Sequence, residues 1–340
     1  MKSDICTEKT RDYLFDNYKA FLIFMVVLGH FVELASDDNL FLECVKWMVF
    51  SFHMPAFVFV SGYFSKKKSS FLKLIRRLMV PYLVFEVLYY LLYVYVIHKK
   101  THLWLFWPKF TLWYLPAMFV WKLVIPYYRK IPGHLPIAVA IGLFAGCLGI
   151  DDNFLTLPRL MVFFPFFVIG ADFKREYITA IRNKISPRFA ALSLFCVNLF
   201  VAAVAIWDEI PVFVFYGRYN YDYLHEENTE GIAIRFLFYC IAFLLNLLYL
   251  SVMSEQKSRF TLLGERTMAV YLFHGLVYGL IAYLWEDLPE MNLVVQSLLI
   301  VLLVVGVTWL LSRKPFTIVL DWITKASFCK GKIACNKNSN

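Results

Sequence analysis

The sequence predicts an all-α polytopic membrane protein of about ten transmembrane helices, with both termini in the cytoplasm. Of its 340 residues, 60% are hydrophobic and only 17% are charged, whereas soluble domains carry about 25% charged residues. The apolar residues form long runs, and about 20 such residues are needed for a helix to cross the hydrocarbon of a bilayer. Basic and acidic residues alternate between successive loops, and this alternation predicts the orientation.

Ten apolar runs are candidate spans. The first lacks a small-residue cleavage site, so we expect it to remain as a helix rather than to be removed as a secretory signal. The fifth and sixth are short, and the sixth contains Pro165. The predicted spans are 18–35, 44–63, 79–97, 112–128, 135–150, 158–173, 189–207, 233–252, 268–285 and 292–311.

The loop charges support an even number of spans with both ends inside the cell, because cytoplasmic loops are rich in Lys and Arg. The loops assigned to the cytoplasm contain basic clusters, and those assigned to the outside contain acids such as Asp151, Asp152 and Glu226. The loop with Lys99, Lys100 and Lys109 is discordant. Basic residues gathered in cytoplasmic loops also account for the net charge of +9. No nucleic-acid partner is therefore expected.

These boundaries divide the chain into three parts. Residues 1–17 are predicted to form a cytoplasmic segment, 18–311 the transmembrane domain, and 312–340 a cytoplasmic tail. The polar end of that tail, from Cys329 onward, is expected to be disordered. The seven cysteines are scattered and contain no CxxC pair, so neither a disulfide framework nor a metal site is predicted.

His30 is the strongest candidate for a catalytic residue. It lies about eleven residues into the predicted first span, near mid-membrane, where an ionisable side chain is costly and usually functional. Lys19 is eleven residues earlier, and eleven steps of about 100° put both side chains on one helix face, roughly 16 Å apart along the axis. Asp16 is placed to hold the Lys19 ammonium at the cytoplasmic interface.

Three further ionisable residues inside predicted spans are candidate functional residues. His53 is followed closely by Pro55, which frees a backbone carbonyl in a helix that lines a polar cavity. Glu86 lies in the third span and His274 in the ninth. The candidate catalytic set is therefore His30, Asp16, His53 and Glu86. A buried histidine or glutamate is also a common structural hydrogen-bonding partner, and this alternative stays open for His53, Glu86 and His274.

A basic cluster before the third span is a candidate anion site. Lys73 and Arg76 lie one helical turn apart, with Arg77 beside them, and could hold the phosphates of a large polyanionic donor. The alternative is contact with anionic lipid headgroups. Trp113 and Tyr114 could line a substrate path together with His274, although aromatic residues also gather in interfacial belts.

Six stretches together resemble the membrane acyltransferase 3 family, and most closely its fucose 4-O-acetylase-like branch. They occur in the family's order over residues 12–285, and each is weakly specific alone. Lys19 replaces the arginine that many members have, which weakens a bidentate phosphate contact. The stretches are DNYKAFLIFMVVLGHF, SFHMPAFVFVSGYF, FLKLIRRLMVPY, LWYLPAMF, FFPFFVIG and GERTMAVYLFHGL.

The resemblance implies an O-acyltransferase in a bacterial cytoplasmic membrane. The donor would be acetyl-CoA or another acyl-CoA, and the acceptor a sugar, polysaccharide or lipid-linked glycan. His30 would be the catalytic histidine, while Lys19, Lys73 and Arg76 would occupy donor-binding positions; we add Arg77 to that set. His53 and His274 match recurring motif positions.

The chemistry fits these residues. A sugar hydroxyl needs a general base to attack a thioester, and a neutral imidazole can supply one. His30 could remove that proton or become acylated and relay the group. A multi-pass transporter or flippase also places His and Glu at the midplane, but related halves are not seen. A non-catalytic partner in glycan assembly and a homo-oligomer stay open.

Overall fold

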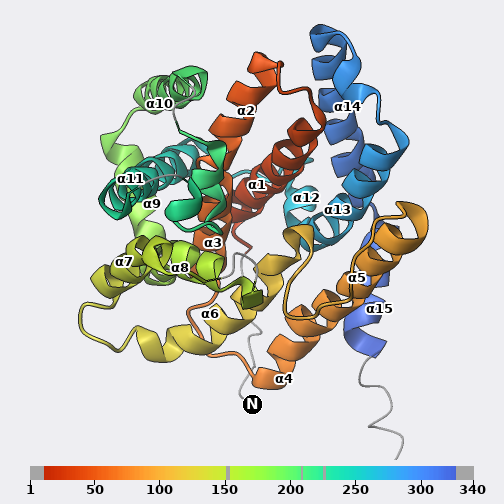
Figure 1. Cartoon of the computed structure of the whole chain (residues 1–340). Helices are drawn as coiled ribbons and strands as arrows, with labels where there is room; N and C mark the ends of the chain where they lie inside the picture. The colour runs from red at the N-terminus through yellow and green to blue at the C-terminus, as the bar shows by residue number, and fades with distance from the viewer. Residues whose placement is uncertain (1–10, 151–153, 208–209, 225–226, 327–340) are drawn as a thin grey trace, which may run out of the picture.

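The chain folds into a bundle of helices (Figure 1). The computed structural model describes residues 11–150, 154–207, 210–224 and 227–326, and these residues contain no strand. The α-helices are α1 (Tyr13–Phe31), α2 (Leu40–Phe50), α3 (His53–Tyr63), α4 (Phe71–Leu74), α5 (Val80–Leu91), α6 (Tyr114–Tyr128), α7 (His134–Phe144), α8 (Leu157–Asp172), α9 (Arg175–Lys184), α10 (Pro187–Trp207), α11 (Asn228–Val252), α12 (Thr261–Glu265), α13 (Thr267–Leu284), α14 (Leu293–Leu311) and α15 (Lys314–Ala326).

Short 3₁₀ and π turns extend several of these helices. The π turn η2 (Ile75–Met79) joins α4 to α5, and the π turn η3 (Leu92–Val96) follows α5, so these elements form one helical segment that is wider at two places. The 3₁₀ turns include η1 (Val32–Leu34), η4 (Phe110–Trp113), η6 (Phe154–Thr156) and η7 (Val212–Tyr216).

The prediction of an all-α polytopic membrane protein is confirmed, and each of the ten predicted ranges coincides with helix. Among the described residues, eight helical segments are long and apolar enough to cross a membrane: Tyr13–Leu34, Leu40–Tyr63, Phe71–Val96, Phe154–Asp172, Pro187–Trp207, Asn228–Val252, Thr267–Leu284 and Leu293–Leu311. The other two predicted ranges hold α6, of 15 residues, and the shorter apolar helix His134–Cys147.

The first helix begins earlier than predicted, which changes the position of His30. Helix α1 starts at Tyr13, so His30 lies in its last turn rather than halfway along it. The early start is stabilised by Asp16 in the first turn, where a carboxylate favours the positive end of the helix dipole. Asp16 also pairs with Arg11 at 2.5 Å and with Lys19 at 2.8 Å. The Asp16–Lys19 contact is the one expected from the sequence.

The bundle is organised around α1 and α3, which Figure 1 shows near its centre, with α10 and α11 to one side and α13 and α14 to the other. Helix α3 packs closely on α8. A Cβ atom at Gly62 would lie 2.1 Å from the Phe167 carbonyl oxygen, and one at Gly170 would lie 2.0 Å from the Phe59 carbonyl oxygen. Only glycine permits this approach of two backbones in a membrane bundle.

The predicted tail begins as an ordered helix. Helix α15 follows α14 and packs near α5 and α13 (Figure 1). It leaves Ile318 and Trp322 largely exposed, as in a helix that lies in a membrane interface. The predicted disordered end, from Cys329 onward, lies outside the described residues.

The glycine contact between α3 and α8 gives a stability prediction. We expect Gly62→Ala or Gly170→Ala to lower the free energy of unfolding by about 1–3 kcal/mol or more, because the added methyl group overlaps a backbone carbonyl. Thermal unfolding of the detergent-solubilised protein measures the change. Gly306→Ala is the control: its Cβ would meet nothing within 4 Å, and alanine is favoured in a helix. Equal melting temperatures for Gly62→Ala and the wild type would contradict the packing argument.

Candidate active site

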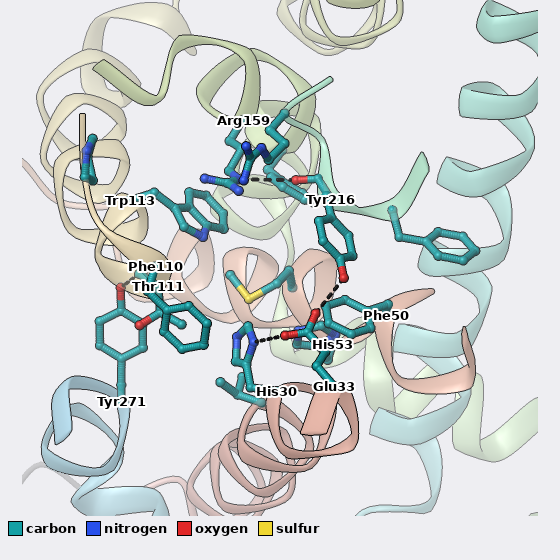
Figure 2. Close-up of a pocket in the computed structure, with 16 residues that line it drawn as sticks. His30, Glu33, Phe50, His53, Phe110, Thr111, Trp113, Arg159, Tyr216 and Tyr271 are labelled. Atoms are coloured by element: carbon teal, nitrogen blue, oxygen red, sulfur yellow. Dashed lines mark hydrogen bonds and ion pairs between the residues drawn. The ribbon is translucent and has the colours of Figure 1, made fainter. Parts of the chain in front are cut away.

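A cavity of about 250 Å³ adjoins the end of α1 that carries His30 (Figure 2). Its wall combines α1, the start of α3, the segment before α6, the start of α8, the segment after α10, and α13. The lining residues are Val26, His30, Glu33, Phe50, His53, Met54, Pro108, Phe110, Thr111, Trp113, Arg159, Phe163, Phe215, Tyr216, Arg218 and Tyr271. The predicted residues His30, His53 and Trp113 are thus brought together.

The central group is an imidazole–carboxylate–phenol chain, drawn with dashed lines in Figure 2. The Nδ1 atom of His30 lies 3.5 Å from Glu33 Oε2, and the Tyr216 hydroxyl donates to Glu33 Oε1 at 2.6 Å. The His30–Glu33 distance is longer than a normal hydrogen bond, and Nδ1 of His30 is buried without a hydrogen-bond partner, so the contact is electrostatic. Glu33 therefore favours a proton on Nδ1, which leaves Nε2 as the nitrogen that can accept one.

Tyr216 stays protonated in this chain. Burial raises the pKa of the Tyr216 phenol well above its usual range, and the neighbouring Glu33 carboxylate raises it further. The hydroxyl therefore keeps its proton at every physiological pH and donates it to Glu33. A neutral donor holds the carboxylate in place without cancelling its charge, so Glu33 remains able to stabilise a protonated His30.

His53 and His274 adopt the same tautomer. Nδ1 of His53 lies 2.7 Å from the Val49 carbonyl oxygen, and Nδ1 of His274 lies 2.6 Å from the Tyr271 carbonyl oxygen. Each imidazole therefore donates through Nδ1 and keeps a lone pair on Nε2. Nε2 of His274 is buried without a hydrogen-bond partner, and its ring centre lies 5.5 Å from that of His30.

The local backbone explains why His53 faces the cavity. The predicted second span is two helices, α2 and α3, with a break at Ser51 and Phe52. Pro55 falls in the first turn of α3, where its missing N–H costs no hydrogen bond. The Val49 carbonyl at the end of α2 is then available to fix the His53 ring.

The opposite wall of the cavity is cationic and aromatic. Arg159 is buried, and its guanidinium lies 5.0 Å from the centre of the Trp113 ring, which also stacks on Phe163. The Arg159 Nε atom donates to the Tyr216 carbonyl oxygen at 3.3 Å. Trp113 therefore supports Arg159 in the cavity wall, and Arg218 adds a second guanidinium to the lining.

Glu86 lies elsewhere, in a buried ion pair. Its carboxylate accepts from Lys109 Nζ at 2.6 Å and from the Lys109 backbone N–H at 3.1 Å. Glu86 is fully buried, and it is not among the residues that line the cavity. The pair also accounts for one lysine of the discordant loop, because the charge of Lys109 is neutralised by a carboxylate from the third span.

The predicted donor-binding residues and Asp16 lie away from the cavity lining. Lys73, Arg76 and Arg77 are exposed, with both arginines in η2, and π turns are frequent at functional sites. Lys73 and Arg77 are close enough to Lys122 of α6 to repel its ammonium.

The remaining predicted substrate residue, Tyr114, is buried at the start of α6 beside the cavity. It makes a 2.5 Å hydrogen bond with Ser61, and its ring centre lies 5.6 Å from that of Tyr271. Tyr114 thus adjoins a lining residue without lining the cavity itself.

Sequence analysis missed several residues of this region. Glu33 follows His30 by three positions, which is the spacing that places two side chains on one helix face. Lys122 and Arg159 are single charges inside predicted spans, the signal that singled out His30. Tyr216 and Arg218 lie in the connection between the predicted spans 189–207 and 233–252, where no periodic pattern singles them out.

No group of three His, Cys, Asp or Glu side chains within the described ranges is arranged to hold a metal ion. The cavity gathers the imidazole of His30, the carboxylate of Glu33 and the guanidinium groups of Arg159 and Arg218. A set of groups of this kind is suited to proton or group transfer.

Comparison with known proteins identifies the family. A family model described as an acyltransferase domain matches residues 12–313, so the chain belongs to the acyltransferase 3 family. A stretch of 56 residues is 43% identical to nodulation protein NolL of Sinorhizobium fredii, and it covers 16% of this chain and 15% of that protein. No solved structure matches the chain.

The Glu86–Lys109 pair gives a prediction that separates structure from catalysis. Lys109→Met should lower the free energy of unfolding by about 3–5 kcal/mol, because it leaves the buried Glu86 carboxylate without its countercharge. The double variant Glu86→Gln/Lys109→Met should recover most of that stability. Thermal unfolding in detergent measures both changes, and acyl transfer per folded molecule should stay near wild type in the double variant. Loss of transfer by folded double variant would instead assign Glu86 to the catalytic machinery.

Proposed function

We propose that the protein is an O-acyltransferase of the cell membrane that moves an acetyl group from cytoplasmic acetyl-CoA to a hydroxyl group of a sugar or surface glycan. The observation that carries this proposal is the His30–Glu33–Tyr216 chain in the cavity wall. Membership of an acyltransferase family indicates the reaction, and the His30–Glu33–Tyr216 group offers the general base that this reaction needs.

The proposed reaction is an attack of the acceptor hydroxyl on the thioester carbonyl. His30 Nε2 takes the hydroxyl proton as the new C–O bond forms, and Glu33 stabilises the resulting imidazolium. The C–S bond then breaks, and the proton passes from His30 to the departing thiolate. Arg159 and Arg218 supply positive charge in the cavity wall, where an anionic oxygen that develops during transfer would be stabilised.

The acceptor is proposed to enter from the extracytoplasmic side. The cavity is lined by Phe215, Tyr216 and Arg218, which belong to the connection that its acidic residues, such as Glu226, assign to the outside. Its volume of about 250 Å³ is near the lower end of ligand pockets, about 300 Å³, which suits one sugar unit better than several. A polysaccharide or lipid-linked glycan would then present a single residue to His30.

The donor is proposed to come from the opposite, cytoplasmic end. Lys19, Lys73, Arg76 and Arg77 belong to the segments that the loop charges assign to that side, and coenzyme A carries several phosphate charges that such cations hold. Eleven residues of helix separate Lys19 from His30, about 16 Å along the axis. An extended donor arm is therefore needed to bring the acyl group to the base.

The first prediction of this proposed function concerns the base, His30. His30→Ala should abolish acetyl transfer from labelled acetyl-CoA in membranes that contain the protein, while His102→Ala, which changes an exposed loop histidine, should leave transfer unchanged. Glycan mass spectrometry of cells with and without the gene then identifies the acceptor by its lost acetyl group. Transfer at the wild-type rate by His30→Ala would overturn the mechanism.

The second prediction concerns Glu33. Glu33→Gln should lower kcat by roughly 10²–10⁴ with little change in either KM, because the base loses its supporting charge while the binding surfaces remain. Glu33→Asp should recover part of the rate. Glu43→Gln is the matched control, since Glu43 pairs with Lys46 on α2 and does not line the cavity. A change in KM alone would refute the role given to Glu33.

Two forms of the reaction can be separated by one measurement. If His30 acts only as a base, single-turnover incubation with acetyl-CoA and no acceptor leaves the protein unmodified. If His30 carries the acyl group, mass spectrometry of the quenched protein detects an acetyl adduct on His30. The adduct would establish the relay, and its absence at full donor occupancy would establish direct transfer.

A further inference from the structure

The face of α1 that joins Lys19 to His30 is closed by packing. Ile23 and Val26 lie between them on that face, and both are buried, with 0% and 3% of their surface exposed. Val26 contributes to the cavity, but Ile23 is part of the central core. A donor arm therefore has no direct path along this face, although the two ends are correctly aligned.

A different helix provides an accessible line between the same two ends. From His53 to Gly62 in α3, every residue is buried except Met54, Phe57 and Ser61, which are partly exposed. Their spacing of three and then four residues places them on one face. Phe57 and Ser61 both contact Tyr114 of α6, so this partly exposed stripe faces α6. At Met54, which lines the cavity, the stripe reaches the cavity.

Helix α6 forms the other side of this stripe. The Tyr114 ring lies 6.0 Å from that of Phe57, and its hydroxyl is 2.5 Å from Ser61 Oγ. Two turns further along α6, Lys122 Nζ donates to Ser65 Oγ at 2.7 Å, and Ser65 Oγ in turn donates to the Ser61 carbonyl oxygen at 2.5 Å. Polar groups therefore extend from Lys122 to Tyr114, and Tyr114 contacts the lining residue Tyr271.

The outer end of this line is strongly cationic. Helix α6, which carries Lys122, packs against α4 and η2, which carry Lys73 and Arg77. Lys73 and Arg77 are exposed and close enough to Lys122 to act on its charge, and no carboxylate pairs with Lys122 among the hydrogen bonds and ion pairs of the described residues. A polyanion at this place would be attracted by all three cations.

We propose that the donor arm lies along the accessible stripe between α3 and α6, with Lys122, Lys73 and Arg77 holding its phosphates and with Ser61 and Tyr114 serving its amide groups. This inference rests on the proposed function and names the donor site for it. The ligand class is a phosphorylated, amide-containing thioester such as a phosphopantetheine derivative. The Ser61–Tyr114 hydrogen bond crosses the accessible stripe. The amide groups of an entering donor arm would replace that bond with hydrogen bonds of their own.

The test compares donors in purified full-length protein reconstituted in lipid. Lys122→Gln should raise KM for acetyl-CoA about tenfold or more, because a charge-assisted contact with phosphate is lost. KM for acetyl-pantetheine, which lacks the phosphates, should change less than twofold. The control Lys130→Gln removes an exposed cation near the end of α6 and should match the wild type with both donors.

A second variant tests the route rather than its entrance. Ser61→Trp fills the stripe and should lower transfer from acetyl-CoA and acetyl-pantetheine at least tenfold more than it lowers hydrolysis of p-nitrophenyl acetate, a small ester that reaches His30 through the outer cavity. If Ser61→Trp does not fold, the donor comparison with Lys122→Gln decides alone. If Lys122→Gln has the same KM as the wild type for acetyl-CoA, and the same KM as the wild type for acetyl-pantetheine, the inference is overturned. Failure of the wild type to use acetyl-CoA would instead overturn the proposed function.

Discussion

The close contact between α3 and α8 is the constraint on which the rest of the structure depends. The backbones meet at Gly62 and Gly170, where any side chain would overlap a carbonyl group. Lipid tails offer no hydrophobic drive for helix association, so such van der Waals contacts are a main source of stability in a membrane. By fixing α3, this contact also fixes His53 at one end of the helix and Ser61 near the other.

Buried charge is the second constraint, and the structure satisfies it in two different ways. Glu86 and Lys109 form a close pair that binds the third span to the following loop. Glu33, in contrast, pairs with a histidine and a neutral phenol. Glu86 therefore faces a permanent cation, whereas Glu33 faces an imidazole that can accept or release a proton. This difference in partners is why the proposed mechanism uses Glu33, while a catalytic role of Glu86 stays a prediction.

The sequence predicts the spans well and the site only in part, for a physical reason. Apolar runs and the Lys19–His30 phase are local properties of one helix, and the structure reproduces the helices together with the Asp16–Lys19 pair. The contact between Glu33 and Tyr216 joins residues 183 positions apart, so no periodicity can indicate it. The closed face between Lys19 and His30 is likewise invisible in sequence, because burial depends on which neighbours pack against it.

The proposed supply of substrates from opposite ends would account for the way the centre of the bundle is built. An open path from the cationic end to the cavity would let water reach a thioester donor, and hydrolysis would compete with transfer. The Ser61–Tyr114 hydrogen bond crosses the proposed donor route, and a donor that offers amide groups could replace this bond with little change in free energy. In the proposed mechanism, the same polar groups would therefore both limit the access of water and bind the donor, once Lys122 and its neighbouring cations hold the donor's phosphates.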